Sequence, residues 1–308
     1  MRDPRLLFAL GLLLVGCPSG SADDDDDEPT PPEPAPLAER SDDECPDLAA
    51  PGLSTFSSAG IDRNVAVYFP DGDTEGLPIL FFWHGLTTPA QDPVGNAVAG
   101  LQLDDLADDW PAIVVVPEAR PTTMPLVGEV SLWGIFGDAE PDLTLFDDLR
   151  TCVADELGGD VRRLHSMGFS GGALWTTQIL MSRSDTLASA VEFSGGAEID
   201  VPLDGGPFLL YETPSKQTPT LLTSGGADDS WPQGLTIIDF TVATDTLQGG
   251  LRVDGHFVVR CEHEEGHTVP QEGWEFGLEW VEGHEYGVAS PIQAEGIEEQ
   301  ESWCRIAD

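Results

Sequence analysis

Residues 168–172 read Gly-Phe-Ser-Gly-Gly, which places Ser170 in the spacing Gly-x-Ser-x-Gly. A serine in a sharp strand-to-helix turn needs these glycines, because larger side chains would collide with neighbouring backbone. The flanks agree, since 163–167 has the character of a strand and 173–180 that of a helix. In this turn the hydroxyl can attack a carbonyl carbon, and the Gly171 N–H would face the resulting oxyanion. We therefore predict that Ser170 is a nucleophile.

The triplet Ser-Gly-Gly occurs twice more and serves as an internal control. Ser194 has Glu192 where the turn needs glycine, and polar residues follow it instead of a helix. Ser224 has Leu222 at that position and runs into Ala-Asp-Asp. Only Ser170 combines both glycines with a strand–turn–helix setting.

A serine nucleophile needs an imidazole to accept its proton and a carboxylate to orient that imidazole. In folds with this turn the chain order is serine, acid, histidine. His267 and His263 both lie in the loop after the last predicted strand, and the flexible Gly266 favours His267 as the base, with His263 as the alternative. The other histidines precede the serine, lie in a strand-like run, or end the last helix, where we expect exposure; they are His84, His165, His256 and His284.

The acid should follow the strand predicted at 220–223, where the chain continues Ser-Gly-Gly-Ala-Asp-Asp. We predict Asp228 as the acid, with the adjacent Asp229 as the alternative. Donors to the oxyanion should also come from the loop after the apolar run 79–83, which continues His-Gly-Leu. This adds the main-chain N–H groups of Gly85 and Leu86, whereas candidate pocket walls are His84, Trp133 and Trp231.

Short apolar runs alternate with helical segments along the chain. Such alternation predicts an α/β fold: a doubly wound, mostly parallel sheet of the α/β-hydrolase type, with helices on both faces and ligands at the carboxyl ends of the strands. The predicted strands are 65–69, 79–83, 113–116, 164–167, 190–193, 220–223 and 256–259, and the predicted helices are 96–107, 143–157, 173–183, 235–247 and 274–281.

Four motifs together resemble the secreted polyhydroxybutyrate depolymerase and feruloyl or acetylxylan esterase group of α/β-hydrolases. They are Phe-Trp-His-Gly ending at Gly85, Gly-Phe-Ser-Gly-Gly-Ala from 168, Gly-Ala-Asp-Asp from 226 and Gly-His-Thr-Val-Pro from 266. The resemblance spans roughly residues 60–270. It implies hydrolysis of an ester, whether small molecule, polyester or plant-polysaccharide ester, by Ser170, Asp228 and His267 without a cofactor or metal. Leu86 and Val269 stand where the group usually has Cys and Trp, so we expect the pocket to differ there.

Two other functions compete with this interpretation. Residues 263–267 read His-Glu-Glu-Gly-His, which matches the zinc motif His-Glu-x-x-His with His263 and His267 as ligands. That motif works only on a helix, whereas here a strand-like run ends just before it and Gly266 and Pro270 disfavour a helix. The second alternative is a non-catalytic binding lipoprotein that keeps the hydrolase fold.

The N-terminus predicts export. Residues 1–16 combine arginines with an apolar run from Leu6 to Val15, which is too short to span a bilayer, and resemble a lipoprotein signal peptide that ends before Cys17. Cys17 would carry the lipid, 17–44 would be an acidic, proline-rich disordered tether, and 45–308 the catalytic domain. Pro at position 18 rather than Asp favours the outer over the inner bacterial membrane.

Acidic residues outnumber basic ones by 56 to 13, giving a formal charge of −43. This charge excludes nucleic acid and anionic lipid surfaces as expected partners, and we expect a monomer. Beyond Cys17, four cysteines remain in an oxidising compartment, where three pairings are possible. A staple between the ends, Cys45 with Cys304, is the favoured guess; the other two are Cys152 and Cys261.

Overall fold

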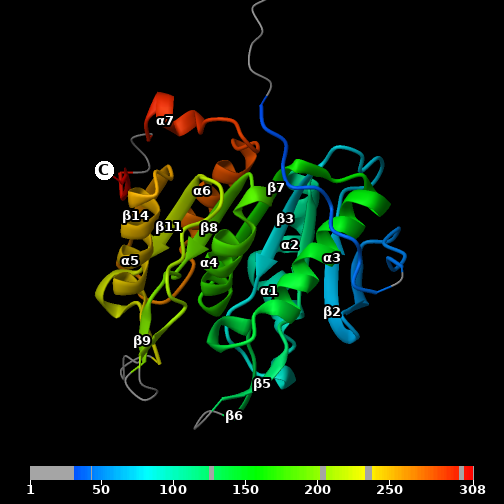
Figure 1. Ribbon diagram of the computed structural model, residues 1–308, viewed down its shortest axis with the longest axis horizontal. Helices are drawn as coiled ribbons and strands as arrows, with labels where there is room; N and C mark the ends of the chain where they lie inside the picture. Colours follow the sequence, from blue (N-terminus) through cyan, green and yellow to red (C-terminus); the bar gives the residue numbers. More distant parts are fainter. Residues whose placement is uncertain are drawn as a thin grey trace, which may run out of the picture. The chain divides into compact units, whose positions relative to one another are not determined.

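The computed structural model describes residues 31–42, 44–124, 128–201, 206–232, 238–297 and 302–307. Within them a nine-stranded sheet runs in the order β1-β2-β4-β3-β7-β8-β11-β14-β15 (Figure 1). Its strands are β1 Gly52–Ser58, β2 Ile61–Tyr68, β3 Pro78–Trp83, β4 Ile113–Pro117, β7 Asp160–Phe169, β8 Ser189–Phe193, β11 Thr220–Ser224, β14 Val258–Glu262 and β15 Cys304–Ile306. The strands from β4 to β14 in this order are parallel, and the outer ones pair antiparallel.

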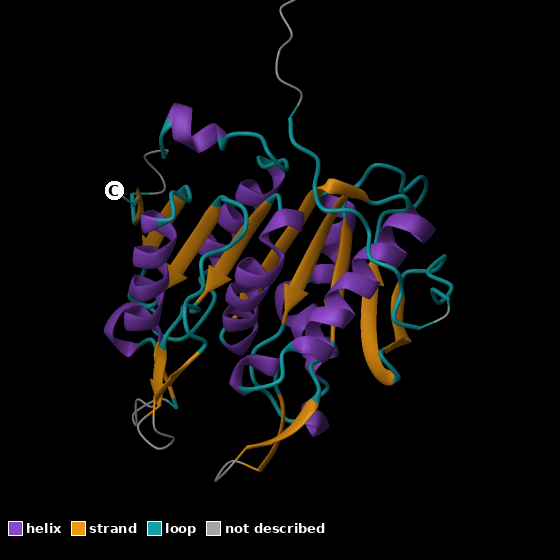
Figure 2. Ribbon diagram, viewed as in Figure 1, coloured by secondary structure: helices purple, strands orange, loops and turns teal. Residues whose placement is uncertain are grey.

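Helices cover both faces of the sheet (Figure 2). They are α1 Pro93–Leu101, α2 Leu103–Asp109, α3 Glu140–Leu157, α4 Gly171–Arg183, α5 Phe240–Val253, α6 Gln271–Glu282 and the short α7 Pro291–Glu295. Apolar side chains of α3, α4 and α5 form one core cluster, and those of α1, α2 and α6 form the other. In β3, Phe81 and Trp83 belong to the first cluster and Phe82 to the second, because successive strand residues point to opposite faces.

The predicted fold class is confirmed, and each of the seven predicted strands overlaps a strand of the sheet. The helix predicted at 96–107 is instead two helices, because Gln102 adopts a left-handed conformation between α1 and α2. The helix predicted from 235 begins only at Phe240, where the Asp239 side chain accepts a hydrogen bond from the Val242 N–H as the N-cap.

Three two-stranded ribbons lie outside the central sheet. They are β5 Pro121–Met124 with β6 Gly128–Ser131, β9 Ile199–Val201 with β10 Gly206–Phe208, and β12 Ser230–Trp231 with β13 Ile238–Asp239. None of them was predicted, because strands of two to four residues carry too little periodicity to be recognised. All three belong to connections that leave the carboxyl ends of β4, β8 and β11.

Two disulfides join Cys45 to Cys152 and Cys261 to Cys304. The guessed pair Cys45–Cys304 is therefore wrong. Cys304 lies on β15 directly opposite Cys261 of β14, whereas Cys45 lies against α3 at the other end of the sheet. Across the described part of the chain, no helix combines the length and apolar character that crossing a membrane requires.

The segment 32–42, here called the N-terminal strap, packs along α3 instead of belonging to a free tether. Arg150 donates to the carbonyl oxygens of Pro36 and Ala35, and the Thr151 hydroxyl donates to the Ala38 carbonyl at 3.0 Å. The predicted tether, 17–44, therefore extends too far, since the folded unit begins at Pro31. Cys17 and the predicted signal peptide lie outside the described residues.

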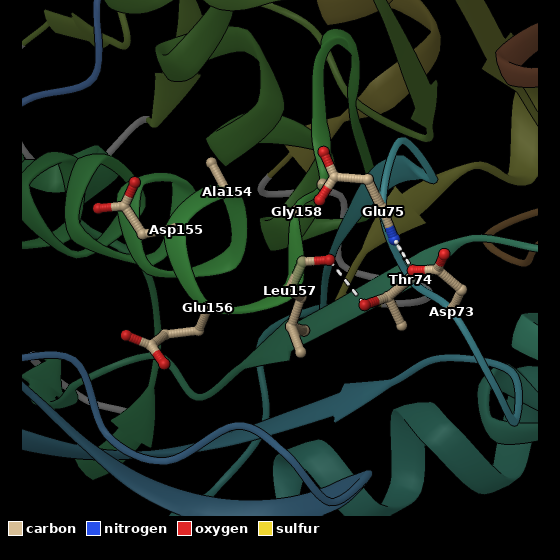
Figure 3. Close-up of a pocket in the computed structure, with 9 residues that line it drawn as sticks. Asp73, Thr74, Glu75, Ala154, Asp155, Glu156, Leu157 and Gly158 are labelled. Atoms are coloured by element: carbon tan, nitrogen blue, oxygen red, sulfur yellow. Dashed lines mark hydrogen bonds between the residues drawn. The ribbon is translucent and has the colours of Figure 1, made fainter.

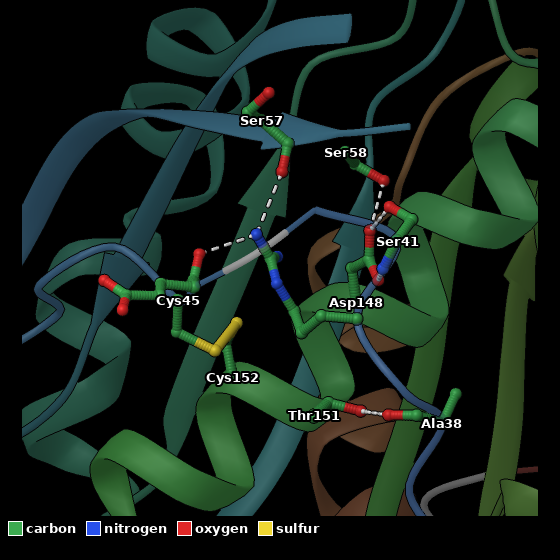
Figure 4. Close-up of a disulfide and its surroundings, with 10 residues drawn as sticks. Ala38, Ser41, Cys45, Ser57, Ser58, Asp148, Thr151 and Cys152 are labelled. Atoms are coloured by element: carbon green, nitrogen blue, oxygen red, sulfur yellow. Dashed lines mark hydrogen bonds between the residues drawn. A yellow bond between two sulfur atoms is a disulfide. The ribbon is translucent and has the colours of Figure 1, made fainter. Parts of the chain in front are cut away.

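The buried Asp148 fastens the end of the strap to the domain (Figure 4). Its carboxylate accepts hydrogen bonds from the Ser41 N–H at 2.9 Å, from the Ser41 hydroxyl and, at 2.6 Å, from the Ser58 hydroxyl. The disulfide of Cys45 and Cys152 follows a few residues later. Strap and disulfide thus both join the start of the folded unit to α3.

A chain that begins at residue 45 should unfold about 4–8 °C below one that begins at residue 31. Without the strap, Asp148 and Arg150 lose partners that now shield them, at a cost of roughly 2 kcal/mol. Thermal unfolding of both chains, followed by circular dichroism in one buffer, measures the difference. Equal midpoints would show that the strap adds nothing to stability.

Candidate active site

Ser170 occupies the turn between β7, which ends at Phe169, and α4, which begins at Gly171. Its backbone has φ 57° and ψ −121°, a conformation that is costly for any residue with a side chain. The Ser170 N–H donates to the carbonyl of Phe193 on the neighbouring β8 at 2.9 Å. The turn therefore holds the serine hydroxyl at the carboxyl edge of the sheet.

The two glycines of the motif are needed for the reason that the sequence suggested. A Cβ atom on Gly168 would overlap the backbone of Gly172, and one on Gly172 would overlap the carbonyl oxygen of Trp83. A larger residue at 172 would push the start of α4 away from β3, and one at 168 would push it away from β7.

His267 lies in the loop after β14 and contacts the serine directly. Its Nε2 is 2.9 Å from Ser170 Oγ, and its Nδ1 is 2.7 Å from Asp229 Oδ1. An Nδ1–H that donates to the carboxylate leaves Nε2 free to accept the serine proton. The imidazole ring is stacked on the Phe240 ring, with centroids 4.4 Å apart. Its centroid also lies 4.9 Å from that of the Phe169 ring. These aromatic neighbours fix the plane of the imidazole.

The carboxylate at His267 belongs to Asp229, so the prediction of Asp228 must be corrected. Residues 226–228 form a single 3-10 turn that leaves Asp228 exposed to solvent. Asp229, one residue further, is 1 % exposed and faces the imidazole. Its second oxygen, Oδ2, accepts hydrogen bonds from the Gly225 N–H at 2.8 Å and the Ser194 hydroxyl at 2.9 Å. The sequence offered both aspartates, and only the direction of the turn separates them.

Main-chain donors lie next to the serine. A Cβ on Gly171 would lie 3.0 Å from the Leu86 nitrogen, and one on Gly85 would lie 3.2 Å from the Ser170 Cβ. Within the described residues, the Leu86 N–H donates to no other group. Gly85 contributes through close approach of its backbone, while Leu86 and Gly171 carry the N–H groups that can meet an oxyanion.

His84 and Trp133 support this loop. The His84 Nε2 accepts from the Ala119 N–H at 3.0 Å, and its Nδ1–H donates to the Gly85 carbonyl at 2.7 Å. Burial lowers the pKa of His84 to about 4, against a smaller opposing effect of the Gly85 carbonyl, so the ring is neutral at pH 7. The indole Nε1–H of Trp133 donates to the His84 carbonyl at 2.9 Å. Both side chains are buried and fix the position of Leu86.

A cavity of about 160 Å³ opens at Ser170 and His267. Its walls are mainly apolar and come from the loop before α3, from α4, from the β12–β13 ribbon and from the start of α5; they include Leu132, Ile135, Leu174, Trp231, Ile238 and Phe240. Trp231 thus lies where the sequence placed a pocket wall. Trp133 does not line this cavity, because it packs inside the core against Trp83 and Trp175.

A second, more open hollow of about 400 Å³ shares Gly85, Leu86 and Phe169 with the first cavity. Its other walls include His84 and Val269. Leu86 and Val269 are the two positions where the sequence departs from the esterase group. Both line this hollow beside the site, as expected.

A larger hollow, of about 440 Å³, lies between residues 73–75 and the end of α3 (Figure 3). One side is closed by the Thr74 hydroxyl, which donates to the Leu157 carbonyl at 2.6 Å. Its charged side chains are all acidic: Asp73, Glu75, Asp155 and Glu156. These groups lack the imidazole and hydroxyl pairing found at Ser170, so this hollow does not compete as the reactive site.

A fourth hollow, of about 400 Å³, lies at the amino ends of β8 and β11. It contains Lys216, the single lysine of the sequence, whose Nζ lies 5.5 Å from the ring centre of Tyr286. The parallel strands run from these amino ends toward the serine turn. Lys216 and Ser170 therefore lie at opposite ends of the strands.

The zinc interpretation does not fit the observed backbone. Residues 263–267 contain no helix, so His263 and His267 do not share a helical face. The two His267 nitrogens contact Ser170 and Asp229, while the His263 Nδ1 accepts from the Glu265 N–H at 3.2 Å.

His284, expected at the surface, is instead buried.

No family model matches the chain, and no curated protein matches its sequence. Solved structures are similar to it in fold. Native pOPH matches with a TM-score of 0.65 and 19% sequence identity over 86% of this chain and 97% of pOPH. Native sOPH gives 0.64 and 19% over 85% and 97%, and Thermogutta terrifontis esterase 2 gives 0.52 and 14% over 77% and 95%. With the sheet order and the serine turn, these similarities identify the fold: the chain is an α/β-hydrolase in architecture.

Proposed function

We propose that this protein hydrolyses carboxylic esters through an acyl-enzyme formed on Ser170. The observation that carries the proposal is the continuous contact from Ser170 Oγ to His267 Nε2 at 2.9 Å and from His267 Nδ1 to Asp229 Oδ1 at 2.7 Å. The names of structurally similar proteins, which include esterases, agree with this chemistry.

The reaction begins when Ser170 Oγ attacks the carbonyl carbon of the ester and its proton passes to His267 Nε2. Asp229 stabilises the imidazolium, and the N–H groups of Leu86 and Gly171 donate to the oxyanion. The tetrahedral intermediate then breaks its bond to the alcohol oxygen, which takes the proton from His267. Water, deprotonated by His267, attacks the acyl-enzyme, releases the carboxylic acid and restores the serine.

The cavity at Ser170 limits the size of the acyl group. An apolar cavity of about 150 Å³ holds one benzene molecule, and this one has about 160 Å³. We therefore propose esters of short or compact apolar acids, whose acyl chain lies against Ile135 and Trp231.

Activity should depend on acyl length in two directions. From the p-nitrophenyl ester of acetate to that of butanoate, kcat/KM should rise about 10-fold, since each buried methylene contributes about 0.8 kcal/mol. The dodecanoate ester, which exceeds the cavity, should be a poorer substrate than butanoate. Steady-state kinetics on this series measures both effects.

Trp231→Ala should widen the cavity and shift the preference toward longer acyl chains. Trp110→Ala, which also removes a half-buried indole but away from the site, is the matched control and should keep the order of substrates. A rate that rises steadily through dodecanoate in the unchanged protein would contradict the size limit.

We also propose that the chain is exported and anchored to a bacterial membrane, the outer one by preference, by a lipid on Cys17. Two disulfides agree with an oxidising compartment outside the cytoplasm. The excess of 56 acidic over 13 basic residues disfavours attraction to anionic headgroups, so anchoring would depend on the lipid. Incorporation of labelled fatty acid into the protein, and its loss in Cys17→Ser, tests this; equal labelling of both would refute it.

A further inference from the structure

The three Ser-Gly-Gly triplets of the sequence lie side by side. They lie at the carboxyl ends of β7, β8 and β11, which are consecutive in the sheet, with Phe169 opposite Phe193 and Phe193 opposite Thr223. The Ser170 N–H donates to the Phe193 carbonyl and the Ser194 N–H to the Thr223 carbonyl, each at 2.9 Å. The Ser194 triplet therefore lies directly beside the nucleophile, and the Ser224 triplet lies one strand further along the sheet.

Both of these triplets donate to Asp229. The Ser194 hydroxyl contacts Oδ2 at 2.9 Å, and the Gly225 N–H contacts the same oxygen at 2.8 Å. The other oxygen, Oδ1, is the one that faces His267. Since Ser194 and Asp229 are each 1 % exposed, water has little access to take over a missing donor.

Ser194 is itself held firmly. It adopts φ 54° although it is not glycine, and the backbone that follows is fixed from two helices. The Thr244 hydroxyl donates to the Gly195 carbonyl at 3.0 Å, and the Thr177 hydroxyl lies 2.9 Å from the Gly196 carbonyl. The Ser194 hydroxyl is thus presented to Asp229 from a rigid loop.

Glu192, directly before this loop, adds a further fixed contact. Its carboxyl is buried beside the Thr177 hydroxyl at 2.9 Å, and burial raises its pKa to about 8, against the opposing hydrogen bonds from Thr177 and Gly196. This contact joins the end of β8, just before the loop, to α4.

We propose that Ser194 is a positioning residue for the acid of the triad, an inference that rests on the proposed ester hydrolysis. Two donors on Oδ2 stop the carboxylate from rotating, so that Oδ1 stays directed at the Nδ1–H of His267. Without the hydroxyl, Asp229 keeps only the Gly225 N–H and the imidazole loses part of its orientation. The effect belongs to the chemical step, because Ser194 is not among the residues that line the cavity at Ser170.

Ser194→Ala and Ser194→Gly should each lower kcat about 10- to 100-fold, the range for a lost hydrogen bond to a charged group, and leave KM within about 2-fold. The glycine variant also relieves the positive φ, so it should be at least as stable as the alanine variant. Ser189→Ala is the matched control: it removes a buried hydroxyl from β8, the strand that leads to Ser194, where Ser189 Oγ lies 2.9 Å from His165 Nδ1, and should keep kcat.

A double-mutant cycle separates this role from a general structural one. In the background of Asp229→Asn, adding Ser194→Ala should change kcat by less than about 3-fold, because the two residues act as a unit. Full additivity in the cycle, or an unchanged kcat in both single Ser194 variants, would overturn the proposal. If Ser170→Ala retained turnover, the proposed function itself would fail, whereas loss there with normal Ser194 variants would remove only this inference.

Discussion

Ester turnover should fall by about 10⁵- to 10⁶-fold when Ser170 is replaced by alanine. The variant keeps the cavity and the N–H groups of Leu86 and Gly171, so it should still bind substrate, but it has no oxygen with which to form an acyl-enzyme. Hydrolysis of p-nitrophenyl butanoate by wild type and Ser170→Ala, purified in the same way, measures the loss. Labelling by a serine-directed phosphonate should disappear with it.

Ser189→Ala serves as the control here too, because it removes a hydroxyl at the opposite end of the neighbouring strand β8. It should retain turnover and labelling. If Ser170→Ala kept the wild-type rate, the measured hydrolysis would have another source, and a binding protein with a hydrolase fold would become the better interpretation.

Asp229→Asn should lower kcat by about 10⁴-fold, whereas Asp228→Asn should change it less than about 3-fold. The amide at position 229 cannot both accept from His267 Nδ1–H and stabilise a charged imidazolium. Asp228 is exposed at the end of the 3-10 turn, and the carboxylate that is hydrogen-bonded to the imidazole is that of Asp229. Steady-state kinetics on the two neighbouring variants provides a matched pair that differs by one residue position.

The reverse ranking, with Asp228→Asn the damaging change, would contradict the observed geometry and restore the expectation from the sequence. Equal losses in both would point to disturbance of the whole turn. Unfolding midpoints of the two variants identify that outcome.

Features that a few neighbouring residues determine are visible in the sequence, whereas features that depend on distant contacts are not. Ser170 could be identified because its requirement for glycines is local, within 168–172. His267 followed from chain order and a single flexible neighbour. The choice between Asp228 and Asp229 depends on which of the two side chains the short turn directs toward the His267 loop. No local sequence pattern contains that information.

Features made by distant pairings were missed for the same reason. Cys304 pairs with Cys261 because β15 lies beside β14 at the edge of the sheet. A strand of three residues is too short to be recognised in the sequence, so this pairing could not be predicted. Trp133 looked like a pocket wall from its place in a loop, yet its indole is needed to hold the His84 carbonyl.

Composition was misleading for the N-terminal strap. Proline-rich residues near Pro36 are typical of a disordered spacer, since they cannot bury much apolar surface. Here their main-chain carbonyls, including that of Ala35, satisfy Arg150 on α3. A buried arginine in need of acceptors orders a segment that has little tendency to order itself.

The position of Lys216 has a practical consequence for handling the protein. Apart from an amino terminus, its ammonium group is the single primary amine that this sequence offers. Amine-reactive dyes or resins would therefore attach at the amino ends of β8 and β11, whereas the serine turn lies at the carboxyl ends of the strands. A molecule coupled through Lys216 would keep the cavity at Ser170 open to the solution, without an engineered tag.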